Sequence, residues 1–224
     1  DSDPFNRWEA GQKLALNEMV RLYQGKGADS VAPALIAGFA RVLDDSAADP
    51  AFAALVLTLP AEAELFEALD HADPTRVCAI HQSVRSVLSV ALNDRWLAAY
   101  TAQQREDFVL EESGARTLKN LCLAYLALTP SPDFILLADT HYRQANNMTD
   151  RMGALSALAD TDLAIRATLF ADFAGTYARD PLVMDKWFSL QASNCDRGGQ
   201  VLPAVKQLMQ HPDFSLKNPN RARS

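Results

Sequence analysis

The fold of this 224-residue chain is decided by the stretch Asp180-Pro-Leu-Val-Met-Asp-Lys-Trp-Phe-Ser-Leu-Gln-Ala192. Its first two residues form a helix-start signal, because an aspartate side chain can accept hydrogen bonds from the free N–H groups of a first helical turn. Proline fits the next position, where its missing N–H would have had no partner. The residues that follow form a broad apolar stripe at helical spacing, made of Leu182, Val183, Trp187, Phe188 and Leu190. The stretch therefore predicts a capped core helix with Trp187 as its large anchor.

The same signal, a capping side chain followed by proline, recurs along the chain. It occurs at Asp3-Pro4, Asp49-Pro50, Asp73-Pro74, Ser131-Pro132, Asp180-Pro181 and Asn218-Pro219. The aspartate carboxylates also favour the positive end of a helix dipole. These dipeptides predict helix starts that are spread over the whole length of the chain.

Between these starts the apolar residues follow a helical period. Strand signals are nearly absent, because no segment alternates apolar and polar residues for long and Ala and Leu dominate over Val and Ile. The stretch 74–104 is interpreted as either one long helix or two. The predicted helices cover residues 4–24, 31–44, 49–58, 61–70, 74–104, 114–128, 132–145, 150–159, 161–178, 181–193 and 199–210.

Short connections join the predicted helices. Connections of about two to six residues force successive helices to lie antiparallel. No sequence repeat of fixed period is visible. We therefore expect an all-α fold, an irregular α-solenoid or superhelix of about eleven antiparallel helices, that forms one helical domain over residues 1–224.

Composition indicates which partners and which compartment to expect. The formal net charge of −7 argues against a general affinity for nucleic acid or anionic membranes. No apolar run approaches the roughly 18 residues that a membrane span requires. The three cysteines, Cys78, Cys122 and Cys195, are odd in number and widely spaced, so they do not suggest a disulfide framework. A reducing compartment, the cytoplasm, fits this pattern best.

Motifs for metal or thiol chemistry are weak. Cys78 and His81 can share a helix face, but two ligands do not make a zinc site and no second pair has ligand spacing. A catalytic Cys78 would need an orienting partner and an oxyanion hole. Arg197 could lower the thiol pKa of Cys195, although the glycines that follow more simply separate two helices. The sequence therefore predicts no catalytic residue, no metal site and no cofactor in this segment.

A polar run separates two of the predicted helices. It reads Gln144-Ala-Asn-Asn-Met-Thr-Asp-Arg151. Two asparagines in a row can end one helix, and Thr149 can cap the next. The run is therefore interpreted as a tight helix–turn–helix.

The last residues, 218–224, begin one further helix. Asn218 and Pro219 form the start signal, yet fewer than two turns follow. We therefore expect the chain to be a piece of a longer polypeptide, truncated at its C-terminal end. Arg221 and Arg223 lie two residues apart, so at most one of them faces any given cavity. A guanidinium at a cavity wall can bind a peptide carboxylate or a backbone carbonyl.

Several runs of the sequence are informative when taken together. They are Phe5-Asn-Arg-Trp-Glu-Ala10, Asn146-Asn-Met-Thr-Asp150, Leu182-Val-Met-Asp-Lys-Trp-Phe-x-Leu-Gln-Ala192, His211-Pro-x-Phe214 and Asn218-Pro-Asn-Arg221. In this order and spacing they resemble the C-terminal helical domain of the bacterial aminopeptidase N family. The members of this family are zinc-dependent M1 peptidases. The resemblance covers essentially the whole chain, although none of the runs is a catalytic motif.

The resemblance implies a longer parent enzyme that removes N-terminal amino acids from peptides. The family holds its zinc in an H-E-x-x-H motif with a downstream Glu and binds the substrate amine with a G-A-M-E-N loop. Neither motif occurs here, so zinc is expected in the parent enzyme and the fragment alone is expected to be inactive.

The resemblance also implies a role for this segment as the wall of a chamber that admits peptides and excludes folded proteins. Its partners would be the catalytic domain of the same polypeptide and peptide substrates, with no nucleic acid and no membrane. By this match Arg223 is the first candidate for a side chain that faces the substrate channel, and Arg221 is the second.

Two other functions stay open. One is a stand-alone α-solenoid scaffold whose concave face binds a protein partner. This alternative predicts a polar capping helix at the end of the chain, whereas the sequence ends soon after a helix start. The other, more remote, is a thiol enzyme that uses Cys78 or Cys195.

Overall fold

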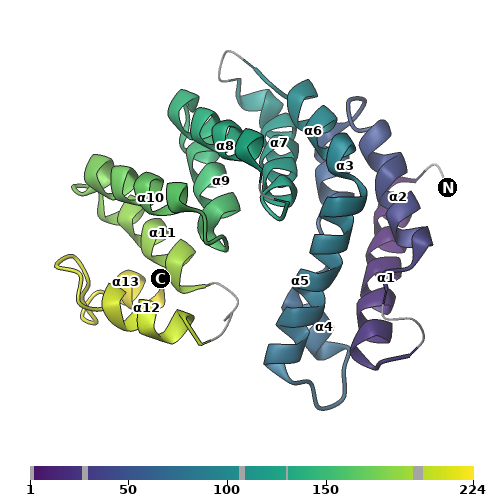
Figure 1. Cartoon of the computed structure of the whole chain (residues 1–224), viewed down its shortest axis with the longest axis horizontal. Helices are drawn as coiled ribbons and strands as arrows, with labels where there is room; N and C mark the ends of the chain where they lie inside the picture. The colour runs from purple at the N-terminus through teal and green to yellow at the C-terminus, as the bar shows by residue number, and fades with distance from the viewer. Residues whose placement is uncertain (1–2, 27–29, 106–108, 130, 194–198) are drawn as a thin grey trace.

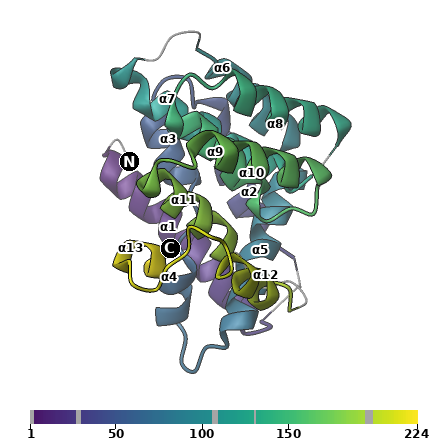
Figure 2. The same cartoon turned by 90° about the vertical axis from the view of Figure 1, so that its left-hand side faces the viewer.

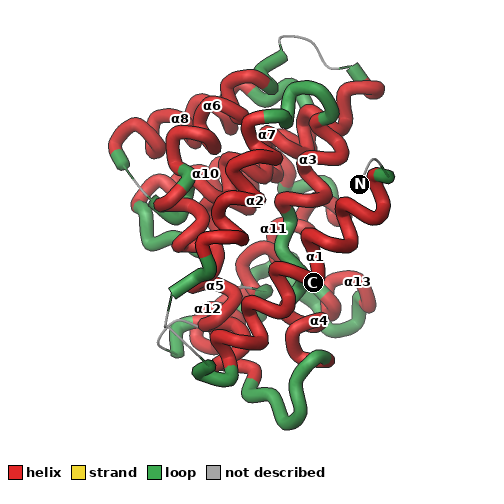
Figure 3. The backbone as a smooth tube through the Cα atoms, turned by 90° about the vertical axis from the view of Figure 1, so that its right-hand side faces the viewer, coloured by secondary structure: helices red, strands yellow, loops and turns green. Residues whose placement is uncertain are grey.

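The regular structure of the chain is helical. A computed structural model describes residues 3–26, 30–105, 109–129, 131–193 and 199–224. No strand is present among these residues, as Figure 3 shows, so the all-α prediction is confirmed. The described residues form the helices α1 (Pro4–Tyr23), α2 (Pro33–Asp44), α3 (Pro50–Leu57), α4 (Glu62–Glu67), α5 (Pro74–Ala91), α6 (Asn93–Ala102), α7 (Ser113–Leu126), α8 (Pro132–Gln144), α9 (Met148–Ala159), α10 (Ala164–Tyr177), α11 (Pro181–Ala192), α12 (Val201–Leu208) and α13 (Pro219–Arg223), with the short 3-10 helix η1 (Leu110–Glu112) before α7.

The helix starts predicted from a capping residue and proline are confirmed. The Asp3 carboxylate accepts from the N–H of Asn6 at 3.0 Å, which satisfies one of the free donors of α1. The Ser131 hydroxyl accepts from the N–H of Phe134 at 3.1 Å at the start of α8. Proline occupies the first turn of α1, α3, α5, α8, α11 and α13, as expected.

Thirteen α-helices occur in the described residues, where the sequence predicted about eleven. One of the two additions is α13, and the other arises because the stretch 74–104 forms two helices, α5 and α6. Leu92 leaves the helical backbone at φ −122° and ψ 20°. On the far side of this break, the indole N–H of Trp96 donates to the backbone oxygen of Leu88 at 3.1 Å. No proline or glycine marks the break, so the sequence left both possibilities open.

Consecutive helices pair, and the pairs stack. The pairs are α6 with α7, α8 with α9, and α10 with α11. α7 also packs on α9, α9 on α11, and α8 on α10, which gives two parallel layers of helices. Figure 1 shows this array curving from α1 through α7, α8 and α9 to α12, and Figure 2 shows α12 and α13 at its far end beside α11. The predicted superhelix of antiparallel helices is confirmed.

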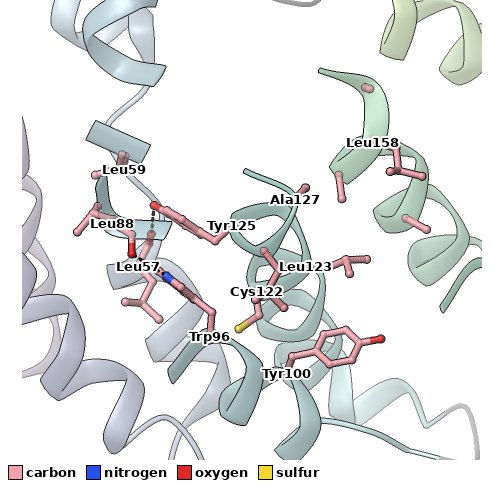
Figure 4. Close-up of a cluster of buried hydrophobic side chains, with 14 of the residues drawn as sticks. Leu57, Leu59, Leu88, Trp96, Tyr100, Cys122, Leu123, Tyr125, Ala127 and Leu158 are labelled. Carbon is pink, nitrogen blue, oxygen red and sulfur yellow. Dashed lines mark hydrogen bonds between the residues drawn. The ribbon is translucent and has the colours of Figure 1, made fainter. Parts of the chain in front are cut away.

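A continuous hydrophobic core lies around α7 (Figure 4). Trp96 and Tyr125 stack there with their ring centroids 4.0 Å apart. The Tyr125 hydroxyl donates to the backbone oxygen of Leu57 at 3.3 Å, so the polar end of this buried ring has a partner. These contacts join α3, α6 and α7.

Helix α11 confirms the predicted core helix and its anchor. Trp187 is buried, and its indole N–H donates to the backbone oxygen of Phe170 at 2.9 Å. The prediction for Leu182 is wrong, because 67% of its surface is exposed. α11 packs on α9, α10, α12 and α13 through the side that carries Met184, Trp187 and Phe188.

In the part of the chain that the structure describes, every helix is too short or too polar to cross a membrane.

Candidate functional site

The two arginines predicted to face a channel lie on α13 in different surroundings. Arg221 is 3% exposed, and its guanidinium donates to a carboxylate oxygen of Asp185. It also donates to the backbone oxygens of Asp213 and Pro181. Arg223 is exposed. The structure therefore does not bring the two arginines into one site, and Arg223 is the one that a ligand can reach. That it contacts substrate stays a prediction.

Arg221 anchors α13 to α11. Its guanidinium carbon lies 4.6 Å from the ring centroid of Phe188. Phe188 in turn contacts His211 and Phe214, with ring centroids 5.3 Å and 5.9 Å away. The C-terminal runs that carried the family resemblance thus meet in one packed cluster.

A second group of polar residues, buried or half-buried, lies where α6, α7, α8 and α9 meet. We call it the Asp150 cluster, and it consists of Tyr100, Lys119, Asn120, His141, Asn147 and Asp150. The Lys119 ammonium donates to Asp150 Oδ2 at 2.7 Å. Asn120 donates to Asp150 Oδ1 at 3.1 Å, and Asn147 donates to Oδ2 at 3.1 Å. Both carboxylate oxygens are therefore bonded, as a buried carboxylate requires.

The polar run 144–151 forms this site because of how its turn is capped. α8 ends at Gln144 and α9 begins at Met148, which confirms the helix–turn–helix. The predicted cap, Thr149, is wrong. Asn147 caps α9 instead, because its Oδ1 accepts from the N–H of Asp150 at 2.9 Å. The true cap stands two residues earlier, so Asp150 lies in the first turn, where the helix dipole favours its charge.

The tautomer of His141 follows from its two partners. His141 Nε2 lies 3.1 Å from the backbone oxygen of Asp150, which can only accept. Nε2 therefore carries the proton and Nδ1 is a lone-pair acceptor. The Tyr100 hydroxyl, 2.8 Å from Nδ1, is then the donor. A chain of hydrogen bonds thus runs from Tyr100 through His141 to the backbone of Asp150.

The electrostatics of the cluster agree with this arrangement. Burial, followed by the nearby Lys119 charge, lowers the pKa of His141 to about 4. Burial alone would raise the pKa of Asp150, but the hydrogen bonds from Lys119 and Asn147 outweigh burial, and the pKa of this carboxyl is lowered. At neutral pH the cluster therefore holds a neutral imidazole beside one ion pair.

A cavity of about 730 Å³ opens beside the Asp150 cluster. It lies between the end of α6, the end of α8 and the start of α9. Its walls include Arg105, Lys119 and Asp150, together with the side-chain amides of Gln104 and Gln144. The cavity therefore has ionised side chains in its wall, beside apolar and amide residues.

Reasoning from the sequence missed this site. Asp150 was predicted as the first residue of a helix over 150–159, and Lys119 was not singled out. One signal was available: Lys119 stands three and four residues before Cys122 and Leu123, which places a lysine on the apolar face of α7. A charge on a buried face needs a partner, and this requirement points to a buried counter-ion.

The residues considered for metal or thiol chemistry lie elsewhere. His81 lies 3.8 Å from a carboxylate oxygen of Glu62, and burial lowers its pKa. Cys78 is part of a disulfide, so the thiol role considered for it is wrong. Cys195 lies outside the described residues. Burial raises the pKa of the Cys122 thiol to about 12, which leaves it protonated at neutral pH. The described residues contain no group of three or more His, Cys, Asp or Glu side chains that could hold a metal ion.

Comparisons with known proteins give a consistent match over the whole chain. The family described as "Domain of unknown function (DUF3458_C) ARM repeats" matches residues 1–224. Aminopeptidase N from Haemophilus influenzae is 38% identical over 98% of this chain, and aminopeptidase N from Escherichia coli is 36% identical over 98%. The chain spans about a quarter of these relatives, 25% and 26% of their length.

A solved structure shows the same arrangement of helices. The crystal structure of Legionella pneumophila aminopeptidase A in complex with aspartic acid matches with a TM-score of 0.83 and 25% sequence identity. The match covers 99% of this chain and 27% of that chain. The chain therefore belongs to the DUF3458_C family of ARM-repeat domains, and it corresponds to the C-terminal helical domain of aminopeptidase N.

Proposed function

We propose that this chain is a domain of a zinc-dependent M1 aminopeptidase and forms the wall of the chamber through which peptides reach the catalytic centre. The observation that carries the proposal is the whole-chain match to aminopeptidases of which it spans about a quarter. The curved, two-layered array of helices supports it, because such an array presents an extended concave surface. The same match to longer enzymes favours this function over a stand-alone scaffold.

Zinc does not fit the described part of this chain. No group of three or more potential ligand side chains occurs there. By the resemblance to the M1 family, we propose that the remainder of the enzyme holds the metal, and we assign no catalytic step to the described residues. Their proposed contribution is to restrict access and to orient peptides.

The test uses the full-length polypeptide that contains this chain, assayed with an aminoacyl p-nitroanilide and with short peptides. We expect activity that a zinc chelator removes and added zinc restores. The purified 1–224 segment should hydrolyse neither substrate. A full-length protein without aminopeptidase activity, or an active 1–224 segment, would contradict the proposal.

The role of Arg223 is tested in the same enzyme. We expect Arg223→Ala to raise KM for peptides severalfold and to leave turnover of the p-nitroanilide unchanged, because an exposed guanidinium binds a carbonyl or carboxylate of the longer substrate. Arg143→Ala, which removes an exposed arginine of α8, is the matched control. Unchanged kinetics of the Arg223 variant on both substrates would remove this residue from the site.

Two expectations from the sequence stay predictions. One is that residues 1–224 form one domain that is truncated at its C-terminal end. The other is the cytoplasmic location. It depended on the cysteine pattern, and the disulfide at Cys78 weighs against that reasoning.

A further inference from the structure

The cavity beside the Asp150 cluster has the size of a ligand site. Its volume of about 730 Å³ falls inside the range of about 300–1,000 Å³ that small-molecule pockets occupy. The lining is mixed, with apolar surface from Leu137 and Ala145 next to ionised and amide side chains. A ligand that carries both a charge and a small organic body suits such a lining.

The acceptors of Asp150 are already used within the protein. Its carboxylate accepts from Lys119, Asn120 and Asn147. Its backbone oxygen accepts from His141 Nε2, and its N–H donates to Asn147. Asp150 therefore has little capacity left to bind a cationic or donor group of a ligand.

Lys119, by contrast, still has N–H donors that are available to a ligand. An ammonium has three N–H bonds. Among the described residues, Lys119 uses one of them to donate to Asp150 at 2.7 Å. Lys119 is 5% exposed, so its remaining donors are largely shielded from bulk solvent. A desolvated cation with unused donors favours an anionic oxygen as a further partner.

Arg105 supplies a second cation at the rim of the cavity. Its side chain is 39% exposed and lies 3.4 Å from a carboxylate oxygen of Glu112, which does not line the cavity. Among the described residues that line the cavity, the ionised groups are thus Arg105 and Lys119 against Asp150, two cations and one anion. His141 is neutral and its Nε2–H is bonded, so it does not alter this balance.

We propose that this cavity binds a small organic carboxylate, such as the α-carboxylate of an amino acid or of a short peptide, through Lys119 and Arg105. The amides of Gln104 and Gln144 line the same space and can bond the attached polar groups. A cavity of this volume with apolar wall surface suits a carboxylate with an organic body better than inorganic phosphate. The proposal concerns binding alone and does not depend on the proposed peptidase activity.

The experiment is calorimetric titration of the full-length polypeptide. N-acetyl-L-alanine is the probe for a peptide end, and L-alanine is the probe for a free amino acid. We expect the dissociation constant of at least one probe to rise about tenfold or more in Arg105→Gln and in Lys119→Met, since each variant removes a charge-assisted hydrogen bond. Arg143→Gln on α8, outside the cavity lining, is the matched control and should leave binding unchanged.

The two probes also identify the source of the carboxylate. Binding of both indicates recognition of the carboxylate alone, and binding of one indicates a peptide end or a free amino acid. N-acetyl-L-alanine methylamide, which lacks the carboxylate, should not bind. If Lys119→Met fails to fold, Arg105→Gln still decides the outcome, because Arg105 lies at the exposed rim.

Three results would overturn the proposal. The first is that neither carboxylate binds, and the second is that binding to Arg105→Gln equals binding to the unaltered protein. The third is that the methylamide or inorganic phosphate binds as tightly as the carboxylates.

Discussion

At the scale of single residues, the Lys119–Asp150 ion pair is held by the completeness of its hydrogen bonding. A buried pair gains little from charge attraction alone, because removing both charges from water is costly. Here Asn120 donates to Oδ1 of Asp150, and Asn147 donates to Oδ2, the oxygen that also accepts from Lys119. The pair therefore depends on neighbours that come from both α7 and the turn before α9.

The pair should be far more sensitive to substitution than an exposed pair of the same type. We expect Asp150→Asn to lower the free energy of unfolding by about 3–5 kcal/mol, because it leaves a buried ammonium without a counter-ion. Asp139→Asn breaks the exposed pair with Arg143, which has the similar N–O distance of 2.8 Å, and should cost less than about 1 kcal/mol. Urea unfolding of the 1–224 chain measures both, and equal losses would contradict the structural role of the cluster.

His141 predicts how the stability of the chain depends on pH. Its pKa is lowered from 6.5 to about 4, so the unfolded chain binds more protons between these values. The free energy of unfolding should therefore fall as pH is lowered through this window, by of the order of 2–3 kcal/mol. The lowered pKa of Asp150 adds a further loss only at lower pH, because its contribution is fully present above the usual aspartate pKa of 3.8.

The control for this prediction is His141→Gln. Glutamine can donate to the backbone oxygen of Asp150 and accept from Tyr100, yet it does not titrate. Urea unfolding at a series of pH values compares the two proteins. The same slope in both, between about pH 6.5 and pH 4, would show that His141 does not set this dependence.

Residue identity alone could not reveal this cluster. Asn147 and Asp150 were visible as turn and cap residues, but nothing in the local sequence links them to Lys119, which is 31 positions away. The partner of His141 Nδ1 is Tyr100, which belongs to another helix. Such pairings come from packing between helices, whereas the caps come from neighbours in sequence.

At the scale of helices, the sequence predicted where helices begin, but it did not predict where the stretch 74–104 breaks into two helices. A capping side chain with proline acts within one turn, so it marked the starts of α1, α3, α5, α8, α11 and α13. The break at Leu92 is a tertiary effect, because Trp96 packs against Tyr125 of α7 at 4.0 Å. The prediction that Leu182 belongs to the buried face of α11 was wrong for the same reason. The helices that pack on α11 determine which of its faces is buried.

The spacing between α7 and α9 depends on Gly153. A Cβ atom at this position would lie 2.2 Å from Asn120 Oδ1. We expect Gly153→Ala to cost about 1–3 kcal/mol, because Asn120 must move and lose its bond to Asp150. Urea unfolding midpoints measure the effect.

Gly175→Ala on α10 is the matched control. No atom lies within 4 Å of a Cβ at Gly175, so alanine should stabilise the helix by about 0.5–1 kcal/mol. If Gly153→Ala also stabilised the protein, α7 and α9 would be able to move apart without a loss of free energy of unfolding.

At the scale of the whole molecule, the curved array exposes more surface than a compact protein. Its accessible surface is 12546 Å². A compact monomer of this mass exposes about 10,000 Å². The excess is the surface that an open solenoid leaves uncovered.

An array of this kind should not be equally stable along its length. In a stacked array of helices, stability should be highest where a helix is surrounded by the most neighbours. α7 packs on α3, α5, α6 and α9, and more than half of its residues are buried. α12 packs on α11 and has no buried residue. We therefore expect amide hydrogens of α12 to exchange at least about 100-fold faster than those of α7, a difference near 3 kcal/mol.

Hydrogen exchange followed by mass spectrometry tests this gradient, and Arg221→Ala locates its cause. Arg221 ties α13 to α11 through Asp185 and Phe188, so its removal should speed exchange in α11 and α13. Exchange in α7 should stay unchanged, because α7 does not contact this end of the array. Arg223→Ala, two residues along the same helix, removes an exposed side chain and should leave exchange unchanged in α7, α11 and α13.

The contradicting outcome is that the amide hydrogens of α7 and α12 exchange at the same rate. Equal rates would mean that the described helices unfold as one cooperative unit. The curved wall would then be stabilised as a whole, and not pair by pair.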